Sequence, residues 1–426
     1  ISVTFDHSMN PATISTANFN LLCSGTPIPI AFGVQLSNTV ALVTPQVFLP
    51  GFASCTLTVT TGVQSNENIP MASPYVLSFV TGVAPVATMV REVDIVQPAH
   101  GGMFTAANGK VFFVAQVVSF GKELWSTDGT FSNTQQVRDI YAGFGNSANP
   151  DYLVTAGNKI FFVAEDGVNG RELWISDGST AGTVMVKDIY AGAGSSSISD
   201  LIVHNGVAYF SADDGIHGQE LWKSDGSAAG TVMIKDISLN NSSSNPTLLT
   251  AVNGTIYFSA TDGSSGYELW KTDGTTAGTI LVRDINSGSA SSYPKNFAAI
   301  GETVLFSAND GISGEELWRS DGSTINTSLI IDIAAGTASS FPEKLTYFGG
   351  NVYFMADDGS HGKELWRTDG NGSGSNLVKD MNPGISSSYV GGINAAQDGI
   401  YLTNQNGAMY ELWFSSGDTV GTTLLA

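Results

Sequence analysis

The chain has 426 residues and holds 38 acidic against 17 basic side chains, a formal net charge of −21 at pH 7. All 17 Lys and Arg lie at or beyond Arg91, and residues 1–90 contain only two acids, Asp6 and Glu67. This balance excludes a nucleic-acid-binding surface, which needs a basic face. No apolar run has the length of a membrane-spanning helix, and no signal peptide is present, as expected of a mature secreted product.

Residues 1–84 are predicted to form a separate domain of short strands. Apolar and polar residues alternate in the segments ISVTFDHSMNPATISTANFNL, TLTVTTGVQS and YVLSFVTG, as is typical of strands with one buried face. Residues 1–13 and 75–82 resemble the two ends of bacterial Ig-like domains, whose repeats open with VTFSxxMDPAT and close with WSFTTG. The resemblance implies a β-sandwich. Because such sandwiches usually begin one strand earlier, we expect this one to lack its first strand.

The two cysteines of the chain both lie in this domain. Cys23 ends the predicted strand NFNLLC, and Cys55 opens the predicted strand CTLTVT. A disulfide between them would tie two strands together and contribute about 3–4 kcal/mol through loop closure. Two buried free thiols are the alternative. We expect the disulfide, because the other features of the sequence indicate an oxidising exterior.

Residues 85–426 repeat one motif seven times. Each copy contains Glu-Leu-Trp followed by a turn of the Ser/Thr-Asp-Gly type, and successive tryptophans lie 47–49 residues apart. The tryptophans are Trp125, Trp174, Trp222, Trp270, Trp318, Trp366 and Trp413. A fixed period of this length is typical of repeat architectures, in which one unit buries its apolar face only against its neighbours.

Each copy contains four short apolar segments separated by Gly-rich turns. In the fourth copy they are residues 248–252, 255–260, 267–272 and 280–285. This pattern predicts an antiparallel meander, and seven meanders predict a seven-bladed β-propeller of four-stranded blades over residues 85–426. The predicted fold class is therefore all-β, an Ig-like sandwich followed by a propeller. An open solenoid is the competing architecture, but it would need polar caps at both ends.

Residues 89–95 (MVREVDI) look like an additional outer strand that precedes the first copy. Ring closure would place this segment in the last blade, beside or beyond residues 422–426. We therefore predict pairing between the two ends of the propeller.

The repeats resemble those of ELWxxDGT-repeat propellers, which occur in bacterial secreted and surface proteins. Residues 166–197 read DGVNGRELWISDGSTAGTVMVKDIYAGAGSSS, against a family pattern of roughly DGxxGxELWxxDGTxxGTxxVKDIxxGxxSS. The resemblance covers residues 89–426. Two departures lie at the ends, where residues 116–120 replace the Asp-Gly loop of the first copy and Ser416 replaces the turn Asp of the last. The resemblance implies the fold and an extracellular location, but no single chemistry.

A cation follows the Glu of the motif by fifteen residues in five copies. If the intervening turn is tight, the two side chains face each other across neighbouring strands and fix the register. The predicted pairs are Glu123 with Arg138, Glu172 with Lys187, Glu220 with Lys235, Glu268 with Arg283, and Glu364 with Lys379. Two copies depart, because Glu316 would meet Ile331 and Glu411 would meet Ala426; Arg91 is a candidate replacement for the last cation.

Asp-Gly loops precede the Glu-Leu-Trp strand in five copies. Ordinary turn chemistry explains them, because Asp binds local amides and Gly accepts positive φ. Calcium is the alternative, since carboxylates and carbonyls suit a hard cation, although no loop has alternating acidic ligands. The calcium candidates are Asp166, Asp214, Asp262, Asp310 and Asp358. No other cofactor is expected.

The tryptophans and the missing catalytic motifs bear on function. Each Trp is expected to pack in the core between blades, with a sugar-binding platform as the alternative. The sequence has no Gly-x-Ser-x-Gly elbow, no phosphate loop and no His-Glu-x-x-His. We therefore expect a protein that is not an enzyme.

The leading functional hypothesis is a secreted or cell-surface structural or adhesive protein that assembles into filaments or a surface layer. Contacts would run through the charge-poor Ig-like module and the free sheet edges. Its partners would be itself or other surface proteins. A carbohydrate-binding propeller is the alternative, followed by a polysaccharide-degrading enzyme.

Overall fold

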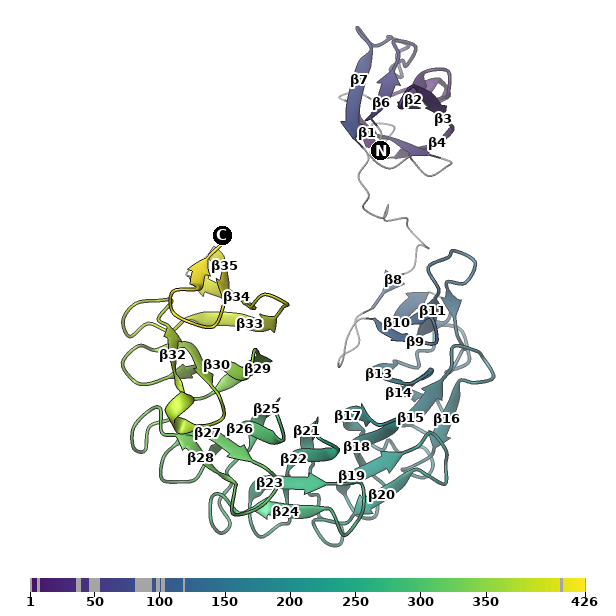
Figure 1. Ribbon diagram of the computed structural model, residues 1–426. Coiled ribbons are helices and arrows are strands. Elements are labelled where there is room, and N and C mark those ends of the chain that lie inside the picture. Colours follow the sequence, from purple (N-terminus) through teal and green to yellow (C-terminus); the bar gives the residue numbers. More distant parts are fainter. Residues whose placement is uncertain are drawn as a thin grey trace. The chain divides into compact units, whose positions relative to one another are not determined.

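The computed structural model describes residues 2–5, 8–35, 40–45, 54–80, 94–96, 100, 104–117, 119–406 and 409–425. The chain forms two compact units, residues 1–89 and 90–426, which we describe separately. Both consist of antiparallel sheets, and the described helical segments are the two short 3-10 turns η1 (Pro11–Thr13) and η2 (Gly372–Gly374) (Figure 1). Among the described residues, no helix is long and apolar enough to span a membrane.

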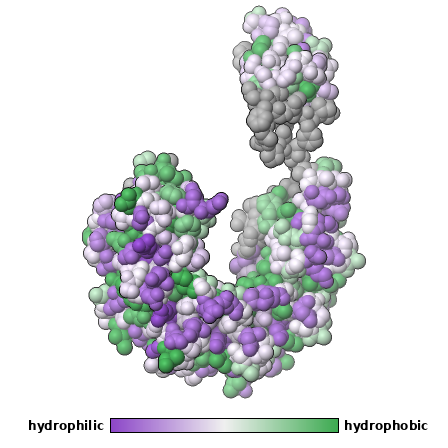
Figure 2. All heavy atoms as spheres, viewed as in Figure 1, coloured by the Kyte–Doolittle hydropathy of each residue, from purple (hydrophilic) through white to green (hydrophobic). Residues whose placement is uncertain are grey.

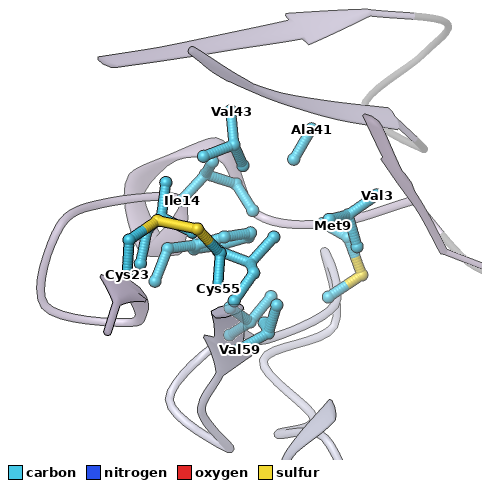
Figure 3. Close-up of a cluster of buried hydrophobic side chains, with 12 residues drawn as sticks. Val3, Met9, Ile14, Cys23, Ala41, Val43, Cys55 and Val59 are labelled. Carbon is cyan, nitrogen blue, oxygen red and sulfur yellow. A yellow bond between two sulfur atoms is a disulfide. The ribbon is translucent and has the colours of Figure 1, made fainter. Parts of the chain in front are cut away.

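Residues 1–89 form a sandwich of two sheets. The larger sheet has the order β3 (Thr26–Ile28), β2 (Phe19–Cys23), β6 (Ser54–Val59) and β7 (Tyr75–Val80). The smaller sheet has the order β1 (Ser2–Thr4), β5 (Val40–Pro45) and β4 (Ile30–Gln35). Figure 3 shows the core, in which side chains from both sheets meet.

The predicted disulfide is confirmed. Cys23 and Cys55 lie directly opposite each other in the β2–β6 pair, and both are fully buried. The bridge lies within the core cluster, beside Ile14 and Val43 (Figure 3). Polar and apolar residues alternate along β6, so that Cys55, Leu57 and Val59 all point into the same core.

Residues 90–426 form seven successive sheets, which we call blades 1 to 7. Figure 1 shows the first strands of the blades along the inside of the row and the fourth strands along the outside. Blade 1 consists of β8 (Asp94–Ile95), β9 (Thr105–Ala107), β10 (Lys110–Val117), β11 (Gly121–Thr127) and β12 (Gln135–Gln136). Blades 2 to 7 are four-stranded meanders in sequence order, as predicted.

The strands of these six blades have the following bounds. Blades 2 to 4 consist of β13 (Asp151–Ala156), β14 (Lys159–Glu165), β15 (Arg171–Ser176), β16 (Val184–Lys187), β17 (Ser199–His204), β18 (Val207–Asp213), β19 (Gln219–Ser224), β20 (Val232–Lys235), β21 (Thr247–Val252), β22 (Thr255–Thr261), β23 (Tyr267–Thr272) and β24 (Ile280–Arg283). Blades 5 to 7 consist of β25 (Lys295–Ile300), β26 (Thr303–Asn309), β27 (Glu315–Ser320), β28 (Ser328–Ile331), β29 (Glu343–Phe348), β30 (Asn351–Asp357), β31 (Lys363–Thr368), β32 (Asn376–Lys379), β33 (Tyr389–Ala395), β34 (Ile400–Asn406), β35 (Met409–Ser415) and β36 (Thr422–Leu424).

The predicted ring closure is wrong for the part of residues 89–95 that the structure describes. Asp94 and Ile95 pair with Gln116 and Ala115 of β10, within blade 1 itself. The reason is geometric: the three-residue β9 covers only residues 110–112 of β10, so the rest of that edge is open to β8. Residues 89–93, including Arg91, lie outside the described residues.

The core of this unit lies between the blades. One cluster joins Tyr209 and Ile237 of blade 3 to Phe258 and Trp270 of blade 4, and similar clusters join the other neighbours. Because a single blade has two apolar faces, it needs a neighbour on each side to bury them. This requirement explains why the sequence copies the unit.

The two units differ in surface chemistry. In Figure 2 the described surface of residues 1–89 is mainly pale, whereas the blades carry dark hydrophilic and hydrophobic residues side by side. The difference follows from composition, because residues 1–90 hold no Lys or Arg and only two acids.

Candidate functional site

Two sets of loops meet at the same end of blades 1 to 6 and form a surface, which we call the loop face. The first set joins the second and third strands, and the second set leads from a fourth strand to the next blade. Their backbones are linked, since Ser196 N donates to Arg171 O (3.2 Å) and Asp213 N of the next blade donates to Ser196 O (2.9 Å). The Ser/Thr-Asp-Gly turns lie at the opposite end, which we call the turn face.

A buried Glu anchors the loop face in blades 1 to 6. The side chain belongs to the third strand and accepts hydrogen bonds from the loop that leaves the blade. Glu268 Oε2 accepts from Ile285 N (2.8 Å) and Ser292 Oγ (2.6 Å), and Oε1 accepts from Ser292 N (2.8 Å). The equivalent residues are Glu123, Glu172, Glu220, Glu316 and Glu364, all fully buried.

The predicted ion pairs within the blades do not form, and this prediction is wrong. In blade 4 a register shift between Leu269 and Trp270 places Arg283 opposite Leu269, one residue away from Glu268. The same shift places Lys187, Lys235, Ile331 and Lys379 opposite a Leu rather than opposite Glu172, Glu220, Glu316 and Glu364. In blade 1, Arg138 lies beyond β12, and Glu123 binds the backbone N–H of Ile140 and Ala148.

Four of these five cations link neighbouring blades instead. Lys235 Nζ donates to Thr279 O of blade 4 (2.8 Å) and lies 5.8 Å from the centre of the Trp270 ring. Such contacts combine a charge-assisted hydrogen bond with a cation–π interaction. Arg138, Lys187 and Arg283 make the same two contacts with the blade that follows. Ile331 cannot, so the contact between blades 5 and 6 lacks this link.

The last predicted pair falls partly outside the described residues. Ala426 and Arg91 are not described. Glu411 Oε2 accepts hydrogen bonds from Asn404 Nδ2 (3.1 Å) and Trp413 Nε1 (2.9 Å) within blade 7.

The buried Glu residues have raised pKa values. Burial raises the pKa of Glu123, Glu172, Glu268 and Glu364 to about 7, against the lowering effect of the backbone and Ser hydrogen bonds. Burial also raises the pKa of Glu220 and Glu316. Desolvation disfavours the ionised form, and no cation replaces the lost hydration.

The Asp residues considered for calcium make local turns. Asp262 Oδ1 accepts from Ser264 N and Ser265 N, both at 2.8 Å, and the other four loops repeat this pattern. Partial burial raises the pKa of Asp358, but hydrogen bonds from His361 and Ser360 outweigh it and lower that pKa to about 2. No group of three or more His, Cys, Asp or Glu that could hold a metal occurs in the part of the chain that the structure describes.

Two of these loops carry an Asp–His contact. His217 Nδ1 lies 2.8 Å from Asp214 Oδ2, and His361 Nδ1 lies 2.8 Å from Asp358 Oδ2. The hydrogen bond to the carboxylate raises the pKa of each imidazole. Both histidines are therefore more readily protonated than a free imidazole.

All seven tryptophans are buried, with exposed fractions of 4–9%, and those of blades 2 to 7 lie in clusters shared with a neighbouring blade. Trp270 packs against Tyr209 of the preceding blade, and Trp318 packs against Tyr257 in the same way. Because these rings are covered, they offer no exposed stacking surface to a sugar.

The first strands hold unusual backbone positions near the loop face. Five non-glycine residues at equivalent places have φ between 52° and 60°, namely Tyr152, Asp200, Leu248, Asn296 and Lys344. Several bind the next blade: Asp200 Oδ1 accepts from Leu248 N (2.8 Å), and Asn296 Nδ2 donates to Pro342 O (2.9 Å). Non-glycine residues seldom adopt this conformation, which tends to occur at functional sites. No repeated motif marks these residues in the sequence, because the residue type changes in every blade.

The loop face also exposes large apolar side chains that the sequence analysis did not single out. Val168, Ile216 and Ile312 occupy the same position of three Asp-Gly loops and are 68–74% exposed. The loops between blades add Phe144, Leu239, Tyr293, Phe341 and Ile385, each at least half exposed. The only signal in the sequence was their place in the repeat, one residue after Asp-Gly or between two blades.

Comparison with known proteins identifies a family for residues 1–81 but only a similar fold for the propeller. Residues 1–81 match the family described as bacterial Ig-like domain, in agreement with the sandwich. That match covers less than half of the chain. No curated protein sequence matches the chain.

Among solved structures, the propeller is similar to parts of several hydrolases. Puromycin hydrolase has 13% identity and a TM-score of 0.41, over 77% of this chain and 54% of that chain. A prolyl endopeptidase has 11% identity and a TM-score of 0.45, over 76% and 49%. The propeller domain of the trilobed protease from Pyrococcus furiosus, described as having an open velcro topology, has 14% identity and a TM-score of 0.38, over 76% and 97%.

This chain spans about half the length of the first and second of these proteins. At such identities the likeness concerns the fold alone. The sequence-based hypothesis of a self-assembling structural or adhesive protein, with its carbohydrate-binding alternative, is contradicted: the solved structures of similar fold are described as peptidases and hydrolases.

Proposed function

We propose that residues 90–426 are an ELWxxDGT-repeat propeller that serves as a non-catalytic binding module of an extracellular protein, with the loop face as its binding surface. The disulfide supports an extracellular location, because such bonds persist in oxidising compartments. The absence of hydrolase motifs from the sequence supports a module without catalysis of its own.

One observation carries the proposal: a position of the loop face beside the anchoring Glu differs from blade to blade. The Glu that anchors the loops is present in each of blades 1 to 6. The residue just before it on the third strand is Lys122, Arg171, Gln219, Tyr267, Glu315 and Lys363 in blades 1 to 6. The position that anchors the loops thus keeps its residue type, while the neighbouring position on the loop face varies, as expected of a surface that recognises a partner.

The exposed apolar residues of the loop face allow a controlled test. A loop-face variant carries V168S, I216S and I312S, and a turn-face variant carries F131S, I325S and V420S. The replaced side chains are 68–74% exposed in the first set and 69–90% exposed in the second. Each chain is immobilised and exposed to the medium and envelope extract of the producing cells, and the retained proteins are quantified by mass spectrometry.

We expect the loop-face variant to lose the proteins that the unchanged chain retains, and the turn-face variant to keep them. Equal retention by all three chains would place the binding surface elsewhere. Hydrolysis of a peptide library by the purified chain would contradict a module without catalysis.

A further inference from the structure

The core of residues 1–89 is incompletely covered along one edge. On β6 the inward-facing residues Leu57 and Val59 are fully buried. On the neighbouring β7, the inward-facing Leu77 and Phe79 are only partly buried, and Tyr75 is 47% exposed. The burial of the inward-facing side chains therefore decreases from β6 to the adjacent strand β7. Thus β7 lies at an open margin of the core.

A pocket of about 950 Å³ lies at this margin. Val3 of β1 and Met9 form its buried part, and Ile69 and Tyr75 stand on its rim with exposed fractions of 59% and 47%. Met71 contributes another apolar wall. The pocket thus lies between an edge strand of one sheet, β1, and an edge strand of the other sheet, β7.

Both flanking strands can accept a further strand. Among the described strands, β1 pairs only with β5, and β7 pairs only with β6. An edge strand presents unpaired N–H and C=O groups, to which an extended peptide adds by main-chain hydrogen bonds. Side chains at alternate positions of such a peptide would enter the pocket, because neighbouring residues of a strand point to opposite faces.

The charge at the pocket restricts the occupant further. Among the described residues that line it, Glu67 is the only charged one. No Lys or Arg precedes Arg91, so this unit offers no such cation to its carboxylate. An occupant with a basic side chain at this place would complement Glu67, whereas an acidic one would be repelled.

We propose that this pocket binds an extended segment of a partner polypeptide, which adds to β7 as a strand, buries apolar side chains at alternate positions and places a basic residue beside Glu67. The inference is independent of the function proposed for the loop face. It concerns a different unit and a different kind of contact.

The test uses the full chain and a labelled heptapeptide, Val-Thr-Val-Thr-Val-Thr-Lys, blocked at both ends. The control peptide has the same composition but groups its three valines together. Binding is followed by fluorescence anisotropy, and hydrogen exchange reports the amides of β7. We expect the alternating peptide to bind at least about tenfold more tightly than the control and to slow exchange along β7.

Variants separate the pocket from the opposite side of the same strand. I69D and Y75D should each weaken binding about tenfold, because both side chains line the pocket. V76D is the matched control: Val76 is 56% exposed, lies next to Tyr75 and points to the other face of β7, so its replacement should change affinity less than about twofold. E67K should weaken binding of the peptide that ends in Lys and strengthen binding of a peptide that ends in Glu.

Three results would overturn the proposal. Equal binding of the alternating and grouped peptides would show that no strand is added. Binding without slower exchange in β7 would place the peptide elsewhere. Self-association that the peptide displaces would identify a second copy of this chain as the occupant.

Discussion

At the scale of single residues, the buried Glu of blades 1 to 6 shows that a carboxylate can organise a loop without a cationic partner. Glu268 receives two backbone N–H groups and one hydroxyl, all from the loop that leads to the next blade. These donors would be unsatisfied without the side chain, and an unsatisfied buried group costs about 1–3 kcal/mol.

Comparison of E268A with E268Q tests this role. We expect E268A to lower the free energy of unfolding by about 2–4 kcal/mol, because it leaves the buried donors without an acceptor. E268Q should cost less than half as much, since its amide oxygen still accepts hydrogen bonds and it carries no buried charge. Urea unfolding at pH 8 measures both values. Equal losses would mean that the charge, and not the acceptor, holds the loop.

A second residue marks a gap in the repeat. Lys235 and Arg283 bind a carbonyl and a Trp ring of the following blade, but Ile331 occupies their position in blade 5. I331K should supply the missing contacts with Trp366 and raise the free energy of unfolding by about 0.5–1.5 kcal/mol.

Substitution with a neutral side chain of similar length provides the control for I331K. I331M should leave stability within about 0.5 kcal/mol, because it adds no charge. Thermal unfolding of both variants distinguishes the two effects. Equal stability of I331K and I331M would show that the link between blades contributes nothing.

At the scale of elements, glycines set how closely the two sets of loops approach. Gly266 has φ +69°, and a Cβ placed there would lie 2.1 Å from Ala290 O. Gly254, in the turn between β21 and β22, has φ +78° but no atom within 4 Å of such a Cβ. The two positions therefore share a left-handed backbone and differ in the space around it.

The pair G266A and G254A separates these causes. G254A should cost about 1 kcal/mol, the penalty for an L side chain at positive φ. G266A should cost roughly 1–3 kcal/mol more, because the loop backbone has to move away. Chemical denaturation of each variant gives the comparison. If the costs are equal, close packing of the loop face does not contribute to stability.

At the scale of the whole molecule, lowering the pH from 8 to 5 should stabilise the folded propeller. The folded pKa values of Glu123, Glu172, Glu268 and Glu364 are about 7, above the ordinary value of 4.5. Their contribution to the free energy of unfolding is complete below pH 4.5. It is lost as pH rises through 7, because the folded state then no longer binds more protons than the unfolded state. The raised pKa values of His217 and His361 act in the same direction.

We expect the melting temperature of the propeller to rise by several degrees between pH 8 and pH 5. It should fall again below about pH 4, where Asp166, Asp214, Asp262 and Asp358, whose pKa values are lowered in the fold, become protonated. Calorimetry across this range, with E268Q as the variant that removes one titrating group, measures the effect. A flat profile between pH 5 and pH 8 would contradict it.

The sequence by itself determined the features that depend on local pattern and on period. Alternation placed the strands, the spacing of Trp125 to Trp413 set the seven blades, and the two cysteines in neighbouring strands indicated the disulfide. Each of these follows from residue types at short range or from exact repetition, which the chain displays directly.

Only the tertiary structure decided the contacts that depend on register and on neighbours. A shift of one residue after Leu269 turned Arg283 away from Glu268 and towards the next blade, and no local pattern announces such a bulge. The short β9 left an edge of β10 that Asp94 and Ile95 fill, although their sequence resembles an outer strand. The loop face and the pocket beside Tyr75 likewise assemble residues from several segments, and only the folded backbone brings those segments together.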